Sequence, residues 1–412
     1  MEYQSTNTSI TKEPIKEKVI SSIYKFIEWQ TKNGYHSYDQ YDFWNSDYGI
    51  ISKRLYYKNK YLGIPFVAPI FTAEIFFPYI RRQLASRKRF PIADAHFILG
   101  FTNLYVYTSS AGYLQKAKAV AEELLESSQK GYSGHCWGYP FDWMTTRGLW
   151  KRGIPLITTT AYCFEAFLRL FDLTKEYFYL NVAYSIFLFT LNDLKTTQIT
   201  QDALACSYSP IDNSQIINAN AYRAFVLVEG CQVFGEMGAL KNANLNINFI
   251  LKSQGEDGSW LYSANDKRDH FVDNFHTCFV LKNLIKINRV LKDERISLAI
   301  KKGFNFYKWH LLGPDKSPLP FAKISRFNVV KKEMYDYAEG ISLCLDMQMM
   351  DNEAAEIACK QVLDVITKYQ KIDGSFITRT NIFNMQNRVP YLRWPQSQIF
   401  YALTNYLLKN KD

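Results

Sequence analysis

The chain has 412 residues, of which 47% are hydrophobic and 16% aromatic, which supplies a large core and excludes a disordered protein. Its formal net charge of +10 is spread along the sequence, and the basic clusters at residues 81–82, 87–89 and 331–332 are short. No nucleic-acid-binding module accompanies them, so the sequence does not indicate a nucleic-acid partner. An anionic glycan, a small acidic molecule or an anionic membrane surface would suit this charge equally well.

The cysteines and the amino terminus favour a reducing compartment. The seven cysteines are scattered, odd in number and without a CxxC spacing, which argues against disulfides and a zinc site. The polar start of the chain lacks the apolar stretch of a secretory signal, so we expect a cytoplasmic protein whose residues 1–12 form a flexible tail. GxGxxG, P-loop and HExxH motifs are absent, and we expect neither a metal nor an organic cofactor.

Helical periodicity dominates the chain. Apolar residues recur at spacings of three and four, the period of a helix with one buried face. The predicted helices span residues 15–32, 66–84, 91–108, 114–129, 157–173, 175–194, 216–236, 239–253, 273–291, 294–310, 333–349, 353–370 and 394–409. Strand signals are confined to short pieces at 204–208 and 376–380. We therefore expect one all-α domain over residues 1–412.

The apolar run at residues 61–80 has the length of a membrane span but contains three prolines and Glu74. Proline inside a helix removes a backbone hydrogen bond and clashes with the preceding turn. We expect a buried helix here. A surface that touches a membrane is the alternative, and a true span is least favoured.

An internal repeat orders the predicted helices. Residues 254–260 and 370–376 share a glutamine, an Asp-Gly-Ser turn and an aromatic residue, offset by 116 positions, and Trp137 marks an earlier copy. Long loops rich in Trp, Tyr, Asp and His alternate with short bare ones. This alternation is typical of helical hairpins arranged in a ring, with the long loops gathered at one end. The sequence therefore predicts an (α/α)6 toroid, six hairpins in a closed ring with one decorated mouth.

The repeated segments resemble the glutamine–tryptophan motifs of toroids of the squalene cyclase and prenyltransferase type. From about residue 30 to 410, the chain more closely resembles bacterial six-hairpin toroid proteins encoded in exopolysaccharide gene clusters, distantly similar to six-hairpin glycosidases. The segments that carry this resemblance are 136–143 (CWGYPFDW), 208–212 (YSPID), 217–222 (INANAY), 257–260 (DGSW), 273–277 (DNFHT) and 390–398 (PYLRWPQSQ). The resemblance implies a role in polysaccharide biosynthesis without specifying the reaction. Because DDxxD and DxDD motifs are absent, a terpene cyclase or prenyltransferase is disfavoured.

Candidate catalytic residues lie at the starts of inner helices, where free N–H groups and long loops meet. Asp273 is placed to cap a helix and His276 follows one turn later, so the two could act together as base or acid; capping and a buried histidine are the structural alternative. Asp142 lies among aromatic residues that would raise its pKa, and Asp336 opens another inner helix. Two opposed carboxylates would suit glycoside hydrolysis, whereas Tyr391 with His276 would suit a uronate lyase or epimerase.

Candidate substrate-binding residues come from the same loops. Aromatic faces stack on sugar rings, and an arginine can bind a carboxylate or sulfate through two parallel hydrogen bonds, so Arg393 is expected to recognise an anionic sugar. The residues expected to bind substrate are Tyr38, Asp39, His135, Trp137, Tyr139, Asn274, Trp260, Arg393 and Trp394.

Taken together, these features and the resemblance predict a carbohydrate-active protein of bacterial polysaccharide biosynthesis, which we expect to be an enzyme. It would act in the toroid mouth on a glycan or a lipid-linked sugar, as a hydrolase, lyase or epimerase, with peripheral contact to a membrane as an option. A catalytically silent glycan-binding or assembly factor is one alternative. The other is an isoprenoid-handling toroid, which an apolar, aromatic-lined tunnel would favour.

Overall fold

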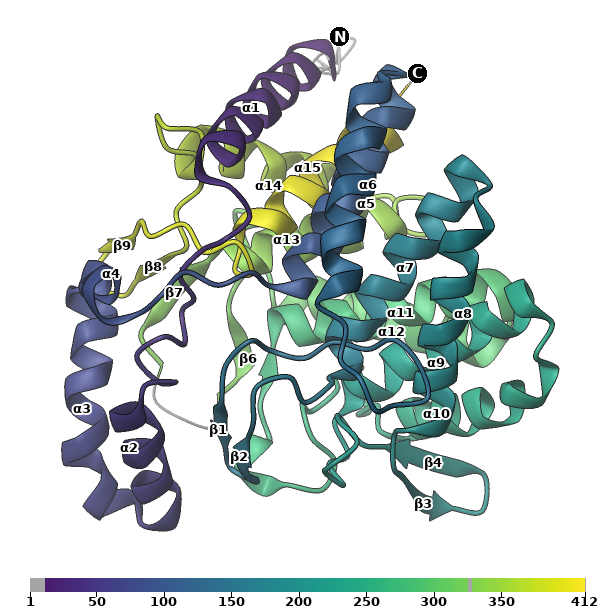
Figure 1. Ribbon diagram of the computed structural model, residues 1–412, viewed down its shortest axis with the longest axis horizontal. Coiled ribbons are helices and arrows are strands. Elements are labelled where there is room, and N and C mark those ends of the chain that lie inside the picture. Colours follow the sequence, from purple (N-terminus) through teal and green to yellow (C-terminus); the bar gives the residue numbers. More distant parts are fainter. Residues whose placement is uncertain (1–11, 325–327, 412) are drawn as a thin grey trace, which may run out of the picture.

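The computed structural model describes residues 12–324 and 328–411. Of the tail expected over residues 1–12, residues 1–11 lie outside the described residues, and Lys12 begins the first helix. Within the described part of the chain, 15 α-helices form most of the structure, and short strands decorate the loops (Figure 1).

Six helices form a closed inner ring. They are α5 (Pro91–Thr108), α7 (Ile157–Thr174), α9 (Ile217–Phe234), α11 (Asn274–Leu291), α13 (Met334–Met347) and α15 (Gln396–Lys409). Each packs against the next in this order, and α15 packs against α5. The ring therefore closes on itself, which confirms the predicted toroid.

A second layer of six helices surrounds this ring. It consists of α6 (Ala111–Glu126), α8 (Tyr177–Asn192), α10 (Leu240–Lys252), α12 (Glu294–His310), α14 (Ala354–Asp364) and α1 (Lys12–Asn33). The first five pack on the inner helix that precedes them in the chain. The sixth pair joins the two ends of the chain, because α1 packs on α15.

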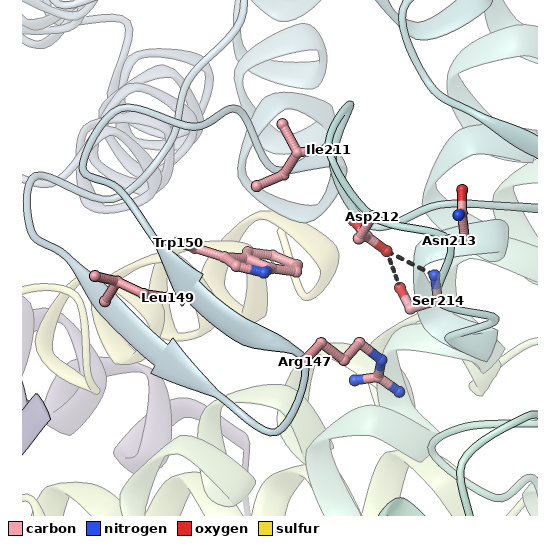
Figure 2. Close-up of a pocket in the computed structure, with 7 residues that line it drawn as sticks. All are labelled: Arg147, Leu149, Trp150, Ile211, Asp212, Asn213 and Ser214. Atoms are coloured by element: carbon pink, nitrogen blue, oxygen red, sulfur yellow. Dashed lines mark hydrogen bonds between the residues drawn. The ribbon is translucent and has the colours of Figure 1, made fainter. Parts of the chain in front are cut away.

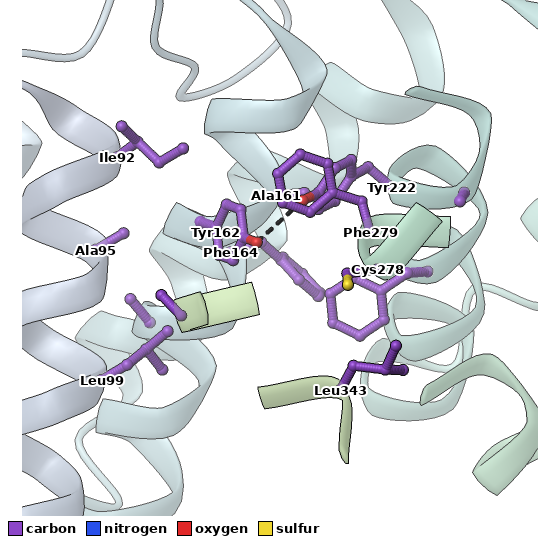
Figure 3. Packing of buried hydrophobic residues seen from close by; sticks show 14 of the residues in the cluster. Ile92, Ala95, Leu99, Ala161, Tyr162, Phe164, Tyr222, Cys278, Phe279 and Leu343 are labelled. Carbon is purple, nitrogen blue, oxygen red and sulfur yellow. Dashed lines mark hydrogen bonds between the residues drawn. The ribbon is translucent and has the colours of Figure 1, made fainter. Parts of the chain in front are cut away.

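The two layers differ in how their sequences are patterned. In α5 every residue from Pro91 to Leu104 is buried, as expected of a helix that is covered on all sides. In α12 only one face is buried, with Ile296, Ile300 and Phe304 along it. Apolar side chains from the inner helices meet in the middle of the ring, where Tyr222 donates a hydrogen bond to Tyr162 (Figure 3). The interior of the toroid is thus a packed core.

The tight turns between inner and outer helices share one backbone conformation. At the ends of α5, α7, α9 and α11, the residues Ser109, Lys175, Gly235 and Lys292 all adopt the left-handed helical region. This is the usual way to end a helix and turn sharply, and glycine adopts it at the lowest cost. Three of these four positions carry a residue with a side chain, so the sequence alone does not mark these turns.

The repeated glutamine segments connect neighbouring hairpins. Gln254 donates hydrogen bonds to the carbonyls of Gly258, in its own turn, and Ala299, in α12. Gln370 binds the equivalent carbonyl of Gly374 and that of Ser22 in α1. Both glycines have a φ of 92°, which a residue with a side chain rarely adopts. Each glutamine therefore links the turn that contains it to the outer helix of the next hairpin in the ring.

A helical hairpin stands beside the ring, formed by α2 (Asp47–Lys58) and α3 (Lys60–Phe76) and followed by the short α4 (Arg81–Leu84) (Figure 1). The two long helices approach closely at Gly63, where a Cβ atom would lie 2.2 Å from the Cα of Tyr56. The sequence did not predict α2, and it merged α3 and α4 into one helix.

The expectation that residues 61–80 form a buried helix is wrong. Most side chains of α3 are exposed, because α2 covers only one of its sides. None of the described helices alone is long and apolar enough to cross a bilayer. Lys60–Phe76 and Pro78–Leu84 meet that criterion only as a pair bent by 99°.

Candidate functional site

The long loops that precede the inner helices carry all the described strands. These are β1 (Trp143–Thr145), β2 (Gly148–Trp150), β3 (Thr196–Thr200), β4 (Ala203–Cys206), β5 (Val272–Asp273), β6 (Phe321–Lys323), β7 (Val330–Glu333), β8 (Arg379–Asn381) and β9 (Gln386–Asn387). In Figure 1 they lie on the side of the ring away from both chain ends. The amino-terminal ends of the inner helices open on this side, which we call the mouth.

Aromatic side chains in mutual contact line the mouth. Trp394 stacks on Tyr335 with ring centres 3.8 Å apart and meets Phe275 edge-on at 5.1 Å. Phe275 lies 4.2 Å from His276, which lies 4.5 Å from Tyr262. We use the term mouth aromatics for the partly exposed members of this lining, which are Tyr41, Tyr139, Trp143, Tyr262, Phe275 and Trp394. Five of them come from four separate loops and Phe275 comes from the first turn of α11, and they present faces on which a sugar ring could stack.

Asp273 and His276 form a hydrogen-bonded pair at the start of α11. Asp273 caps the helix by accepting the backbone N–H of His276, and its carboxylate also contacts the His276 Nδ1 at 2.7 and 2.9 Å. Asp273 is buried, whereas the His276 side chain keeps 21% of its surface exposed. Nε2 has no hydrogen-bond partner within residues 12–324 and 328–411. A carboxylate on Nδ1 orients an imidazole and directs its other nitrogen to accept or donate a proton.

The Asp273–His276 pair borders a cavity of about 10 Å³, together with Asn218, Trp260 and Tyr262. This volume is close to the minimum that holds a single water molecule. A saccharide would therefore have to contact His276 from the open side of the mouth, next to the mouth aromatics.

A larger cavity of about 360 Å³ lies between the β1–β2 hairpin and the 209–215 loop (Figure 2). Trp150 and Arg147 border it from the hairpin, and Asp212 and Ser214 border it from the loop. The Asp212 carboxylate is occupied by hydrogen bonds from its own loop, including the Ser214 N–H at 2.7 Å. Arg147 binds Asp269 at 3.2 Å, so it connects the hairpin to the loop that carries Tyr262. The cavity has the volume of a small-molecule site and combines an indole with polar groups.

Arg393 and Asp39 form a buried ion pair beneath the mouth aromatics. The Arg393 Nε and Nη2 each donate to an Asp39 carboxylate oxygen at 2.7 Å, and the two side chains are 4% and 0% exposed. The guanidinium also contacts the faces of Tyr139 and Tyr41. Because this guanidinium already binds a carboxylate of the protein, its expected role in recognising an anionic sugar stays a prediction.

Asp336 lies in the wall of the toroid. Both its carboxylate oxygens are buried and without a hydrogen-bond partner among the described residues. Burial raises the pKa of Asp336 well above its ordinary value, and the nearby carboxylates of Glu333 and Asp273 raise it further. Burial is the main reason why the pKa values of its neighbours Cys278, in α11, and Tyr307, in α12, are raised. Asp336, in α13, therefore has neighbours in both the inner helix α11 and the outer helix α12.

Asp142, a further candidate catalyst, lies near the surface. Its carboxylate binds Lys151 at 2.8 Å and the backbone N–H of Arg152 at 2.9 Å. The hydrogen bond from Lys151 is the main reason why the pKa of Asp142 is lowered. A lowered pKa is the opposite of what a general acid needs, and the structure does not bring Asp142 together with Asp273 and His276.

The other sequence-predicted residues make local contacts. Trp137 and Trp260 donate their indole N–H to Leu124 and Ile250, Asn274 binds the carbonyls of Leu311 and Leu319, and His135 binds Ser185. Tyr391 is buried against Arg81 and accepts a hydrogen bond from Asn387, and Tyr38 donates to Arg82. Of the predicted set, the mouth brings together Asp273, His276, Tyr139, Arg393 and Trp394.

Sequence reasoning missed several residues of the mouth. Trp143 and Trp150 face each other across the β1–β2 pair, 5.5 Å apart, and Arg147 lies in the turn between these strands. The alternation of aromatic residues at 139, 141 and 143 was the available signal. Phe275 lies between Asp273 and His276 in the chain and Tyr262 lies in the loop before them, but nothing in their local pattern marks them. In the described parts of the chain, no group of three or more His, Cys, Asp or Glu side chains is placed to hold a metal ion.

Comparisons with known proteins support the fold. No protein-family model and no curated protein sequence matches the chain. Among solved structures, cellobiose 2-epimerase from Bacillus thermoamylovorans is similar with a TM-score of 0.59 and 11% identity, over 77% of this chain and 87% of the other. A GH76 α-mannanase from Bacteroides thetaiotaomicron gives 0.57 and 11%, over 90% and 99%. An unsaturated glucuronyl hydrolase specific for heparin gives 0.59 and 10%, over 96% and 97%. At these identities the likeness shows the fold alone, and the chain has the (α/α)6 toroid of these three proteins.

Proposed function

We propose that the protein is a carbohydrate-active enzyme that binds a saccharide in the mouth and transfers a proton through His276. The observation that carries this proposal is the Asp273–His276 pair, with Nδ1 held by the carboxylate and the ring partly exposed among the mouth aromatics. An imidazole held in this way is suited to general acid–base catalysis near neutral pH. The epimerase and hydrolase names of proteins with the same fold support a saccharide substrate.

An epimerase or lyase is the reaction class that the geometry supports best. Both reactions begin by removing a proton from a sugar carbon, which a single oriented imidazole can do. Hydrolysis is the second candidate, because it needs a carboxylic acid with a raised pKa, and burial together with the nearby carboxylates of Glu333 and Asp273 raises the pKa of Asp336. In that case the wall between α11 and α13 would have to open toward the substrate.

The finer parts of the proposal depend on sequence motifs. Bacterial polysaccharide biosynthesis follows from the resemblance to exopolysaccharide-cluster proteins, and a lipid-linked sugar is the form of substrate that fits contact with a membrane. A catalytically silent glycan-binding factor would use the same mouth aromatics.

An isoprenoid is disfavoured because the ring interior contains the buried Lys282–Glu339 ion pair, whose charges are incompatible with an apolar tunnel.

The test uses a panel of neutral and uronic-acid oligosaccharides with three readouts. Unsaturated products report a lyase, new reducing ends report a hydrolase, and deuterium uptake from heavy water reports an epimerase. We expect His276→Gln to lower turnover at least ~100-fold while saccharide binding persists, and Asp273→Asn to lower it with a changed pH profile. His36→Gln is the control, since this exposed histidine is not among the candidate site residues.

Two outcomes would contradict the proposal. If His276→Gln turns over a saccharide as fast as the parent protein does, His276 is not the proton-transfer residue. If the parent protein binds saccharides but turns none of them over under any of the three readouts, the non-catalytic alternative replaces the enzyme.

A further inference from the structure

The hairpin of α2 and α3 exposes an unusually apolar surface. Tyr61 and Leu62, at the start of α3, are 85% and 68% exposed, and Leu84, in α4, is 71% exposed. We call this region the α3 surface, and its large exposed side chains are Tyr61, Leu62, Ile64, Phe66, Phe76, Phe77, Tyr79, Ile80 and Leu84. A contiguous exposed apolar patch of this kind usually marks a site of interaction with a protein or a membrane.

The turn between β8 and β9 extends the α3 surface. Phe383 is 59% exposed, and its ring centre lies 6.2 Å from that of Phe76. Ile382, in the same turn, is also exposed. Two elements that are more than 300 residues apart in the chain therefore present apolar side chains on one side of the molecule.

Basic side chains flank this apolar surface. Residues 47–89 contain nine basic residues and two acidic ones, and of the nine, Arg81, Lys88 and Arg89 pair with acidic side chains. Lys58 and Lys60 lie at the amino-terminal end of α3, Arg54 lies one turn before them, and Arg82 lies in α4 beyond its other end. All four are exposed, and no acidic side chain in the described ranges pairs with them. Exposed basic side chains without an acidic partner in the described ranges thus lie near both ends of the exposed apolar helix.

We propose that the α3 surface is a docking site for an anionic lipid bilayer, in which α3 lies in the plane of the membrane. An interfacial helix combines exposed aromatic and aliphatic side chains with flanking lysines and arginines that bind anionic headgroups. The exposed tyrosines Tyr61 and Tyr79 suit the headgroup level, where amphipathic rings concentrate.

The attachment of α3 to the toroid favours the in-plane orientation over a span. Arg81 is buried, binds Glu74 of α3 at 3.0 Å and donates to the carbonyl of Asp39. This contact connects the carboxyl-terminal part of α3 to the body of the protein. An inserted, spanning α3 would have to break it and expose a buried ion pair to the bilayer core, which is costly.

Docking by this surface would bring the mouth close to the membrane. The α2 helix packs on β1, and Tyr41, in the loop before α2, stacks near Trp143 of β1 at 6.5 Å. Both residues belong to the mouth aromatics. The docking itself does not depend on which reaction the mouth performs.

The experiment is flotation of the full chain with vesicles of phosphatidylcholine alone or mixed with phosphatidylglycerol. We expect binding to the mixed vesicles that weakens as salt is added. Leu62→Ser and Phe66→Ser should each lower the partition coefficient roughly tenfold, because each removes a side chain that enters the interface. Lys58→Glu with Lys60→Glu should remove the preference for anionic lipid.

Matched controls come from α12, on the outer layer. Leu298→Ser and Trp309→Ser change side chains that are 55% and 79% exposed, and Lys301→Glu with Lys302→Glu repeats the charge change on another surface. These variants should bind vesicles as the parent protein does. All the substitutions are at exposed positions, and circular dichroism and thermal unfolding confirm that each variant is folded.

Four outcomes would overturn the proposal. The first is that the parent protein does not float with the mixed vesicles, and the second is that the α12 variants lose binding as much as the α3 variants do. The third is that light scattering shows a dimer that Leu62→Ser dissociates, which would mean that a second copy of the chain occupies the surface. The fourth is that bound protein resists extraction by alkaline carbonate, which would indicate a membrane-spanning helix rather than docking in the plane of the membrane.

Discussion

Substitution of Arg393 distinguishes a structural role of the Asp39–Arg393 ion pair from a role of Arg393 in substrate binding. In Arg393→Leu, the Asp39 carboxylate stays buried next to Asp42 and retains the Tyr41 N–H as a hydrogen-bond donor. Removing one partner of a buried, doubly hydrogen-bonded ion pair costs about 3–5 kcal/mol, far more than the ~0–1 kcal/mol of an exposed pair. We therefore expect Arg393→Leu to lower the free energy of unfolding by about 3–5 kcal/mol.

Urea unfolding followed by tryptophan fluorescence near neutral pH measures this loss. The double variant Asp39→Asn/Arg393→Leu removes the buried charge as well and should recover at least ~2 kcal/mol. Lys151→Leu is the control, because Lys151 pairs with Asp142 at the surface and should cost less than ~1 kcal/mol. If Arg393→Leu unfolds like the parent protein and instead loses saccharide binding, the sequence prediction for Arg393 is right and our reasoning is refuted.

Three further changes test other parts of the fold by urea unfolding. Burial and the nearby Lys282 lower the pKa of His96 to about 3, from an ordinary value of 6.5. At pH values between these two, His96 is therefore protonated in the unfolded chain only. Stability should fall as the pH falls through this window, by about 2.7 kcal/mol at pH ~4.5, and His96→Phe should remove this part of the pH dependence. Lys292→Gly should add ~0.5–1 kcal/mol, because Lys292 ends α11 at a φ of 54°. Gln370→Ala should cost ~1–3 kcal/mol, because two carbonyls lose their donor.

Each of these changes has a control and a contradicting result. His36→Gln, at an exposed histidine, should leave the pH dependence of stability unchanged, and an equal pH dependence in His96→Phe and the parent protein would show that His96 is not buried as a neutral ring. Lys301→Gly, within α12, should destabilise the protein by ~1 kcal/mol, and a similar loss for Lys292→Gly would contradict the left-handed turn. Gln254→Ala should cost as much as Gln370→Ala, and a loss below ~0.5 kcal/mol in both would show that the repeated glutamines do not hold the hairpins together.

The sequence predicted the ring because the signals that encode it are local. Helical periodicity places the apolar stripe of each helix, and the two glutamine turns, at 254–260 and 370–376, mark equivalent positions two hairpins apart. The closing pair of α1 and α15 also follows from periodicity, once a ring is assumed. Strands β4 and β8 overlap the predicted strand pieces at 204–208 and 376–380, whereas the β1–β2 pair was not predicted, because three-residue strands leave no periodic pattern.

The candidate site was predicted only where its members are neighbours in the chain. Asp273 and His276 are one helical turn apart, so their pairing could be read from the sequence. The partner of Arg393 could not, because Asp39 is 354 positions away and several other carboxylates were equally available. The aromatic neighbours of Asp142 predicted a low-dielectric loop, but Lys151 binds the Asp142 carboxylate at the surface.

The sequence by itself determined the all-helical class, the six-hairpin ring and the loops that carry the mouth, because periodicity, turn residues and repeats act over a few neighbouring positions. Only the tertiary structure decided which charged groups neutralise each other, which aromatic side chains meet in the mouth, and that the apolar helix α3 lies at the surface. Those outcomes depend on contacts between residues that are far apart in the chain. An apolar helix has the same sequence pattern whether protein, membrane or water surrounds it.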